Sequence, residues 1–198
     1  MHELSSESLA QLFLDARTLT AWKPEPVSDE LLHRVYELTR LGPTATNSHP
    51  SRFFFVRSAE AKARLKPALN PGNVDKTMAA PATVVVATDP KFYEKMTVLF
   101  PARGAQLVEG LGSMPVEKRD FMTTQASGLE AAYFMLAARS LGLDCGPMAG
   151  FDREKVDATV LEGTGWKSAL LINVGYGDRT ALHPRLPRLD FDVACRIA

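Results

Sequence analysis

Gly-Pro-Thr-Ala-Thr-Asn-Ser-His-Pro, residues 42–50, leads directly into a short apolar run of strand-forming residues at 53–56. Gly42 and Pro43 end the helical pattern before them, so the stretch predicts a loop between a helix and a strand. Its hydroxyl, amide and imidazole groups suit hydrogen bonding to a planar ligand with polar edges. The alternative is an ordinary connection, because Gly, Pro, Asn and Ser are common in turns. The polar side chains are those of Thr44, Thr46, Asn47, Ser48 and His49.

Two further strands are predicted outside this loop. Residues 83–87 and 169–174 are continuous apolar runs, which is typical of strands that are covered on both faces. Helical patterns separate these runs along the chain. The sequence therefore predicts an α/β or α+β sandwich built around one sheet.

The helices have recognisable starts. Ser28, Ser58 and Asp152 each stand just before a helical pattern and suit the N-cap position, where a side-chain oxygen accepts a backbone N–H. A further helical pattern covers residues 9–16. In the helix after Ser28, the predicted buried face comprises Leu31, Val35 and Leu38.

Two regions depart from this alternation. Residues 90–116 contain repeated Pro and Gly among aromatic residues, which predicts an irregular and partly helical excursion. Residues 121–141 form a helical pattern that is apolar almost all round, so that helix must be buried on every side. Burial against a second subunit and burial in the centre of the core are both open explanations.

Composition narrows the class of protein. A chain of 198 residues that is 45% hydrophobic predicts a single domain covering residues 1–198. Equal numbers of basic and acidic residues, 23 of each, disfavour a nucleic-acid binder. No apolar run approaches about 18 residues, no signal peptide is recognisable, and the two cysteines form no disulfide framework, so we expect a cytoplasmic protein. The scattered histidines predict no metal site.

Four more patterns could serve the same ligand as the 42–50 loop. Arg17 followed by Thr18 suits a phosphate, because arginine forms charge-assisted, forked hydrogen bonds. Asn73 and Lys76 are three residues apart, which places both on one helix face. Taken singly, each pattern is also typical of solvated surface residues or of turns. The other two are the glycine-containing stretch 146–152 and the basic stretch that contains His183 and Arg185.

Together, these five segments resemble, in order, the motifs of the nitroreductase family of FMN-dependent oxidoreductases. The resemblance implies a central, mostly antiparallel sheet flanked by helices, in an intertwined homodimer with FMN between the subunits. It implies that NADH or NADPH gives a hydride to flavin N5, and that a small substrate then takes it in a ping-pong cycle. The flavin does the chemistry in this scheme, so no protein side chain is assigned as catalytic.

The resemblance also implies which residues hold the flavin. Its phosphate would meet Arg17, Thr18, His183 and Arg185. The pyrimidine edge would meet Asn73 and Lys76, and the ring would lie against the backbone of Met148, Ala149 and Gly150. The partner subunit would supply the loop residues, which are Pro43, Thr44, Ala45 and Asn47.

Within the family, the likeness is greatest to the malonic semialdehyde reductase branch of pyrimidine utilisation, through segments 44–47, 92–94, 99–101 and 141–152. That branch implies reduction of malonic semialdehyde to 3-hydroxypropionate, with Arg103 as a candidate for the substrate carboxylate. General nitro, quinone or enone reduction is the alternative. Non-catalytic flavin binding and a cofactor-free interaction module are the other hypotheses. The departures from the family pattern are Ala16, His49 for Gln, Ser51 for Trp and Ala149 for Glu.

Overall fold

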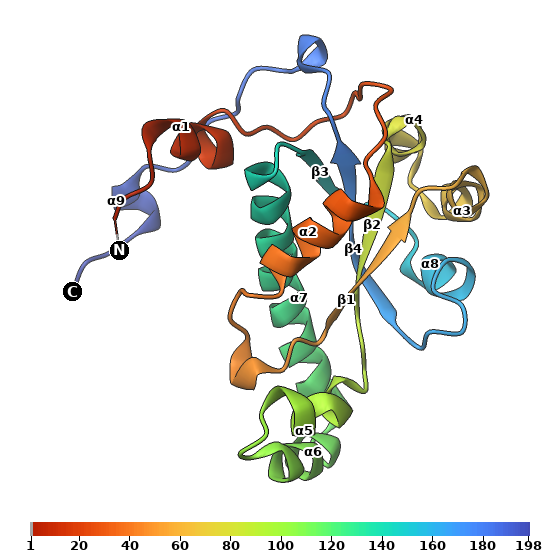
Figure 1. The fold of residues 1–198 in the computed structure, drawn as a ribbon, viewed down its shortest axis with the longest axis vertical. Helices are drawn as coiled ribbons and strands as arrows, with labels where there is room; N and C mark the ends of the chain where they lie inside the picture. The colour runs from red at the N-terminus through yellow and green to blue at the C-terminus, as the bar shows by residue number, and fades with distance from the viewer. Residues whose placement is uncertain (1) are drawn as a thin grey trace.

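Four antiparallel strands form one sheet in the order β1-β2-β4-β3 (Figure 1). The computed structural model describes residues 2–198, apart from the side chain of Ala181. The antiparallel sheet flanked by helices is confirmed, and so are the three predicted strands. The strands are β1 (Ser51–Val56), β2 (Ala82–Thr88), β3 (Asp144–Met148) and β4 (Lys167–Gly175).

Strand β3 was not predicted, because the residues at 146–152 are also typical of turns. The first part of that stretch pairs with β4, with Gly146 opposite Asn173 and Pro147 opposite Ile172. Proline cannot donate to a neighbouring strand, so it is confined to positions such as sheet edges. β3 is an edge strand in this sheet, which explains why Pro147 is accommodated there.

Helices cover both faces of the sheet (Figure 1). Val84 and Val86 of β2 pack in one core with the long helix α7, and Val85 packs in the other core, because successive strand side chains point to opposite faces. The first core lies under α2 (Asp29–Thr39) and α7 (Val116–Ser140). The second lies under α3 (Ala59–Leu65), α4 (Pro71–Ala79) and α8 (Arg153–Thr159).

The predicted caps are confirmed as N-caps of α2, α3 and α8. Ser28 accepts the N–H of Leu31 at 3.2 Å, Ser58 that of Ala61 at 3.1 Å, and Asp152 that of Lys155 at 3.0 Å. Short 3-10 turns supplement these helices: η3 (Lys66–Ala68) follows α3, and η5 (Arg179–Ala181) follows β4.

The predicted buried face of α2 is wrong at one position. Leu38 is 45% exposed, whereas Leu32, Val35 and Thr39 are buried. These three positions share one face at the helical period, so the face is turned slightly from the predicted one. The exposed outer side of α2 therefore carries apolar side chains in the single protomer.

Core burial accounts for only one face of α7. Phe134 is fully buried and stacks on Phe53, with ring centroids 5.4 Å apart. Phe121 and Leu129 lie on the same helix but are 65% and 43% exposed. Burial in the centre of the core therefore explains the apolar residues on the inner face of α7. The apolar residues on its outer face are exposed in one protomer.

The excursion at residues 90–116 contains three short helices around a small core of Phe92, Met96 and Leu111. They lie together at one end of α7 (Figure 1). Arg119 of α7 donates to the carbonyls of Leu111, Gly112 and Met114, which ties the excursion to that helix. The helices are η4 (Phe92–Lys95), α5 (Met96–Leu99) and α6 (Gly104–Gly112).

Both chain ends lie outside the layered core (Figure 1). The predicted helix at 9–16 is instead α1 (Ser6–Leu9) followed by a π-helical turn η1 (Ala10–Leu14), and α9 (Phe191–Ala194) lies near the C-terminus. Within residues 2–198, no helix combines the length and apolar composition needed to cross a membrane.

Candidate functional site

Two arginines from opposite ends of the chain share one neighbourhood. Arg17 donates from Nη2 to the carbonyl of His183. Arg185 donates from Nη2 to the carbonyls of Leu14 and Ala16, at 2.6 and 2.9 Å. Each guanidinium has five N–H donors, so each keeps donors for a further acceptor. A phosphate suits such a pair, because its charge offsets the repulsion between two neighbouring cations.

The segment after Arg17 runs along the outer edge of β3. Thr18 forms a bridge with Cys145, and Leu19 donates its N–H to the Cys145 carbonyl at 3.1 Å. Further along, Trp22 Nε1 donates to the carbonyl of Lys76 at 3.0 Å. This segment thus connects the arginine pair with α4.

The structure brings Asn73 and Gly150 into contact. Asn73 Nδ2 donates to the Gly150 carbonyl at 2.7 Å. A Cβ on Gly150 would lie 2.8 Å from the same nitrogen and 3.0 Å from Asn70 Nδ2, so only glycine fits without rearrangement. Met148 is buried and Ala149 is exposed, while Lys76 is half-buried one turn beyond Asn73 on α4.

The predicted loop residues lie elsewhere in the protomer. The turn η2 (Ala45–Asn47) lies near α5, whereas α4 lies at the opposite end of the sheet (Figure 1). Tyr133 donates from its hydroxyl to the Pro43 carbonyl at 3.0 Å, and Thr44 Oγ1 accepts the N–H of His49 at 3.1 Å. One protomer therefore does not bring this loop to Arg17 or Asn73. Its assignment to the partner subunit stays a prediction.

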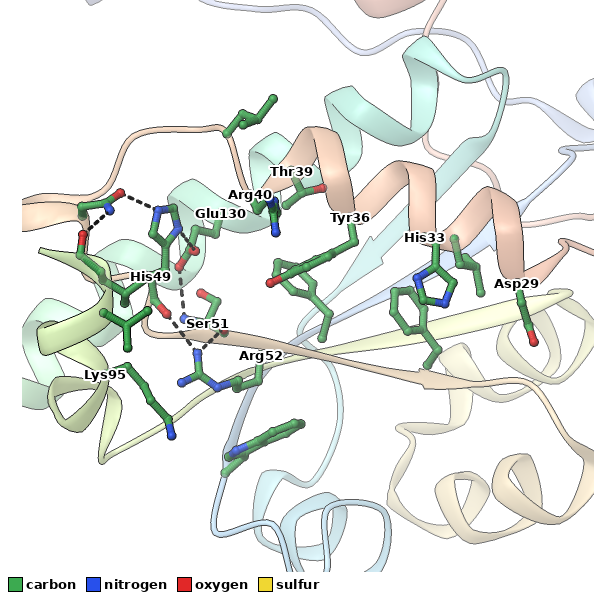
Figure 2. A pocket seen from close by; sticks show the side chains of 18 of the residues that line it. Asp29, His33, Tyr36, Thr39, Arg40, His49, Ser51, Arg52, Lys95 and Glu130 are labelled. Atoms are coloured by element: carbon green, nitrogen blue, oxygen red, sulfur yellow. Dashed lines mark hydrogen bonds and ion pairs between the residues drawn. The ribbon is translucent and has the colours of Figure 1, made fainter. Parts of the chain in front are cut away.

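Glu130 was not predicted from the sequence as a site residue. From α7, its carboxylate contacts the 42–50 loop at His49 and the first residue of β1, Ser51. The Glu130 side chain is 5% exposed in the middle of α7. Oε1 lies 3.2 Å from His49 Nδ1, and Oε2 accepts the N–H of Ser51 at 3.1 Å (Figure 2). The sequence does carry a signal for Glu130, because it is the one acidic residue within the apolar run 129–138. A carboxylate buried in such a helix needs a polar partner.

A groove of about 960 Å³ runs beside β1 and α2 (Figure 2). Phe53 and Phe55 of β1 and Tyr36 of α2 give it apolar walls. β1 is an edge strand, so one side of its backbone faces no neighbouring strand of this sheet. Basic side chains also line the groove: His33, Arg40, Arg52, Arg57 and Lys95.

Cys145 is unsuited to nucleophilic chemistry. Burial raises the pKa of its thiol to about 12, because the interior disfavours the thiolate. Lys62 is structural: burial lowers the pKa of its ammonium, which donates to the carbonyls of Met78 and Ala80 at the end of α4. Within residues 2–198, no group of three or more His, Cys, Asp or Glu side chains could hold a metal ion.

Comparison with known proteins shows which family the sequence matches. Residues 16–176 match the family described as "Nitroreductase family". A relative from Burkholderia lata, named "Putative NADH dehydrogenase/NAD(P)H nitroreductase", is 52% identical over 197 residues, covering 100% of both chains.

Solved structures share the fold at low sequence identity. A "putative nitroreductase" ydfN from Bacillus subtilis superposes with a TM-score of 0.87 at 20% identity, covering 98% of this chain and 100% of that one. A "putative nitroreductase in complex with FMN" from Exiguobacterium sibiricum gives 0.84 at 21% identity, covering 100% of both chains. The match across residues 16–176 and the full-length relative together decide the assignment. The chain belongs to the nitroreductase family.

Proposed function

We propose that this protein is an FMN-dependent NAD(P)H oxidoreductase that delivers a hydride to a small acceptor. The observation that carries the proposal is the meeting of Arg17 and Arg185, which are far apart in sequence, next to the segment that leads to α4. The names of the Burkholderia relative and of the FMN-bound structural neighbour support the same cofactors.

The residues present fit FMN chemically. The arginine pair, Thr18 and His183 would hold the phosphate, which carries negative charge and several acceptor oxygens. Gly150 has no Cβ, so the Asn73 and Asn70 side chains pack directly against it, and Asn73 is held beside the backbone of Met148 and Ala149 that would lie against the ring. Asn73 and Lys76, on the neighbouring face of α4, would donate to the carbonyl oxygens of the pyrimidine edge.

When bound, FMN would supply hydride transfer through N5, from NADH or NADPH to the acceptor, in two successive half-reactions. The protein's part is to bind and orient the two small molecules in turn. Lys76 would place a positive charge beside the pyrimidine edge, which stabilises the reduced anionic ring relative to the oxidised ring.

Lys76→Ala should therefore lower the midpoint potential of the bound flavin. Loss of one charge-assisted contact of about 1.5 kcal/mol corresponds to about 30 mV for a two-electron couple. A spectroelectrochemical titration measures the shift, with the exposed Lys91→Ala as the control. An unchanged potential in Lys76→Ala would remove this residue from the ring edge.

A homodimer would complete the site. The loop residues Pro43, Thr44, Ala45 and Asn47 would reach the flavin of the partner subunit, which explains their distance from α4 within one protomer. The apolar outer faces of α2 and α7 would then be covered by the second copy.

For the acceptor, we propose malonic semialdehyde, reduced to 3-hydroxypropionate. Arg103 is exposed at the start of α6, where it could meet the substrate carboxylate. Parallel assays with malonic semialdehyde, nitrofurazone and a quinone test this choice, since a nitro or quinone preference would replace it. The cytoplasmic location stays a prediction.

The experiment for the proposed activity is anaerobic reduction. Purified protein should be yellow, and anaerobic mixing with NADH or NADPH in a stopped-flow instrument should bleach the flavin absorbance, with one nicotinamide oxidised per flavin. Retained colour with unaltered nicotinamide would leave a flavin-binding protein without this activity. Colourless protein that takes up no added FMN would refute the proposal entirely.

A further inference from the structure

An unbroken series of hydrogen bonds connects the core helix α7 to the exposed loop (Figure 2). Ser51 donates its N–H to Glu130 Oε2, and Glu130 Oε1 lies 3.2 Å from His49 Nδ1. His49 Nε2 lies 2.9 Å from Asn47 Oδ1, and Asn47 Nδ2 donates to the Leu99 carbonyl at 2.8 Å. We call Glu130, His49 and Asn47 the relay.

The direction of the relay follows from its two ends. The Leu99 carbonyl only accepts, so Asn47 must present its NH₂ group there and turn Oδ1 toward His49. Oδ1 also only accepts, so His49 must carry a proton on Nε2. The other ring nitrogen, His49 Nδ1, then lies 3.2 Å from Glu130 Oε1.

The loop that the relay holds is strained. Thr46, Asn47 and His49 have φ values of 54°, 55° and 39°, in the left-handed region that residues other than glycine rarely adopt. Such backbone persists only where its surroundings impose it. The His49 N–H to Thr44 Oγ1 bond supplies one local restraint. The relay supplies the restraint that reaches the rigid core.

Burial differs sharply along the relay. Glu130 is 4% exposed and belongs to the core helix, His49 is half-buried, and Asn47 is exposed at the tip of the loop. Glu130 is thus fixed in the core, and Asn47 is free to meet a ligand at the surface. This arrangement suits a role in orienting Asn47, because a binding residue is positioned precisely only when neighbouring groups fix its side chain. The Leu99 contact also joins the loop to α5, at the edge of the excursion.

We propose that Glu130, acting through His49, is a positioning residue that fixes Asn47 and the 43–47 loop for contact with the flavin of the partner subunit. This inference rests on the proposed function. Asn47 is the residue aimed at the flavin, and Glu130 touches neither flavin nor substrate.

Substitutions at Glu130 test the relay. Glu130→Ala removes the anchor and should weaken FMN binding about tenfold to a hundredfold, the loss expected from a hydrogen bond with a charged partner. Glu130→Gln can donate to His49 Nδ1 and accept from Ser51, so it should stay within about threefold of wild type. Ser127→Ala is the matched control, because Ser127 is buried one turn away and bonds only within α7.

Two measurements separate positioning from general destabilisation. In flavin-free protein, amide hydrogen exchange should rise at residues 44–51 in Glu130→Ala, and should match wild type in Glu130→Gln and Ser127→Ala. In FMN titrations, Glu130→Ala combined with His49→Ala should cost no more than either change alone, because both break the same series of bonds.

The outcomes distinguish this inference from the function beneath it. If wild-type protein binds and reduces FMN while Glu130→Ala binds it equally well, the positioning role is refuted and the function stands. Equal losses in Glu130→Ala, Glu130→Gln and Ser127→Ala would likewise refute it, since those losses would reflect stability. If wild-type protein binds no FMN, the proposed function fails and the inference fails with it.

Discussion

Replacing Arg185 by alanine should weaken FMN binding by about 1.5–3 kcal/mol, the value of a hydrogen bond to a charged group. Arg185 and Arg17 lie together with the carbonyls of Leu14, Ala16 and His183, so both guanidinium groups can face one phosphate. Titration of flavin-free protein with FMN, followed by flavin fluorescence, gives the dissociation constant. The expected increase is about tenfold to more than a hundredfold.

Arg188→Ala is the matched control for this change. Arg188 lies in the same C-terminal stretch and is exposed, and within residues 2–198 it donates only to the nearby carbonyls of Leu186 and Pro187. It should bind FMN as the wild type does. Because Arg185 also holds the backbone of the N-terminal segment, the thermal unfolding of flavin-free Arg185→Ala should be compared as well. Unchanged FMN affinity in Arg185→Ala would place the phosphate elsewhere.

Riboflavin provides a second check on the same contact. It lacks the phosphate but keeps the ring, so its affinity should be nearly the same in wild type and Arg185→Ala. A parallel loss for riboflavin and FMN would mean that Arg185 supports the ring pocket indirectly, through the segment that contains Leu14 and Ala16.

The elements predictable from sequence are those whose signals are local. Strands β2 and β4 are buried on both faces, so their apolar runs identify them. Ser28 and Ser58 cap helices whose first turns follow immediately, so their roles are also readable. β3 was missed because Gly146 and Pro147 are turn residues, and only their place at a sheet edge permits them in a strand.

The segments of the candidate site can be recognised separately in the sequence, but the sequence does not show which of them meet. The Asn73–Gly150 contact joins residues 77 positions apart, and the His49–Glu130 contact joins residues 81 positions apart. Neither pairing has a local signal, because the sheet and α7 determine which loops meet. For Glu130, a charged residue in an apolar helix signals that a partner exists without naming it.

Disrupting the apolar positions of the C-terminal segment should dissociate the proposed dimer and release the flavin that it would bind. Leu189, Phe191, Val193 and Ile197 are 73%, 59%, 67% and 88% exposed in the protomer. Leu189, Phe191 and Val193 occur at alternate positions, and Cys195 and Ile197 continue the alternation, a pattern typical of an extended strand. The helix α9 spans only one turn and buries none of its side chains, so opening it costs little.

The groove beside β1 is the proposed place for this segment of the second copy. Its apolar walls at Tyr36, Phe53 and Phe55 match the apolar side of the segment, and the free edge of β1 can pair with an added strand. Each subunit would then cover the groove of the other, as expected for an intertwined homodimer. The same exchange of C-terminal segments would hold the 43–47 loop of each subunit against the partner subunit.

Phe191→Ser combined with Val193→Ser should raise the dissociation constant of the dimer by about two to four orders of magnitude. The reason is that four apolar side chains, two on each copy, would lose the burial gained in the dimer. Phe191 and Val193 are 59% and 67% exposed in the protomer, so each loses about half of a full burial, about 0.8–1.5 kcal/mol, and the combined cost is about 3–6 kcal/mol. Sedimentation velocity over a dilution series, read at protein and flavin wavelengths, gives both the dissociation constant of the dimer and the amount of flavin bound to each species. Flavin should leave together with the dimer, because the loop residues of the partner complete the site.

The matched control changes the intervening polar positions. Asp190→Ser combined with Asp192→Ser alters the same segment but removes no apolar side chain, so its dimer and its flavin content should equal those of wild type. A dimer that tolerates both pairs of changes would place the subunit interface away from β1. Monomers that keep stoichiometric FMN would show that residues 43–47 of a second copy are not needed, and the shared site would be wrong even if the family chemistry were right.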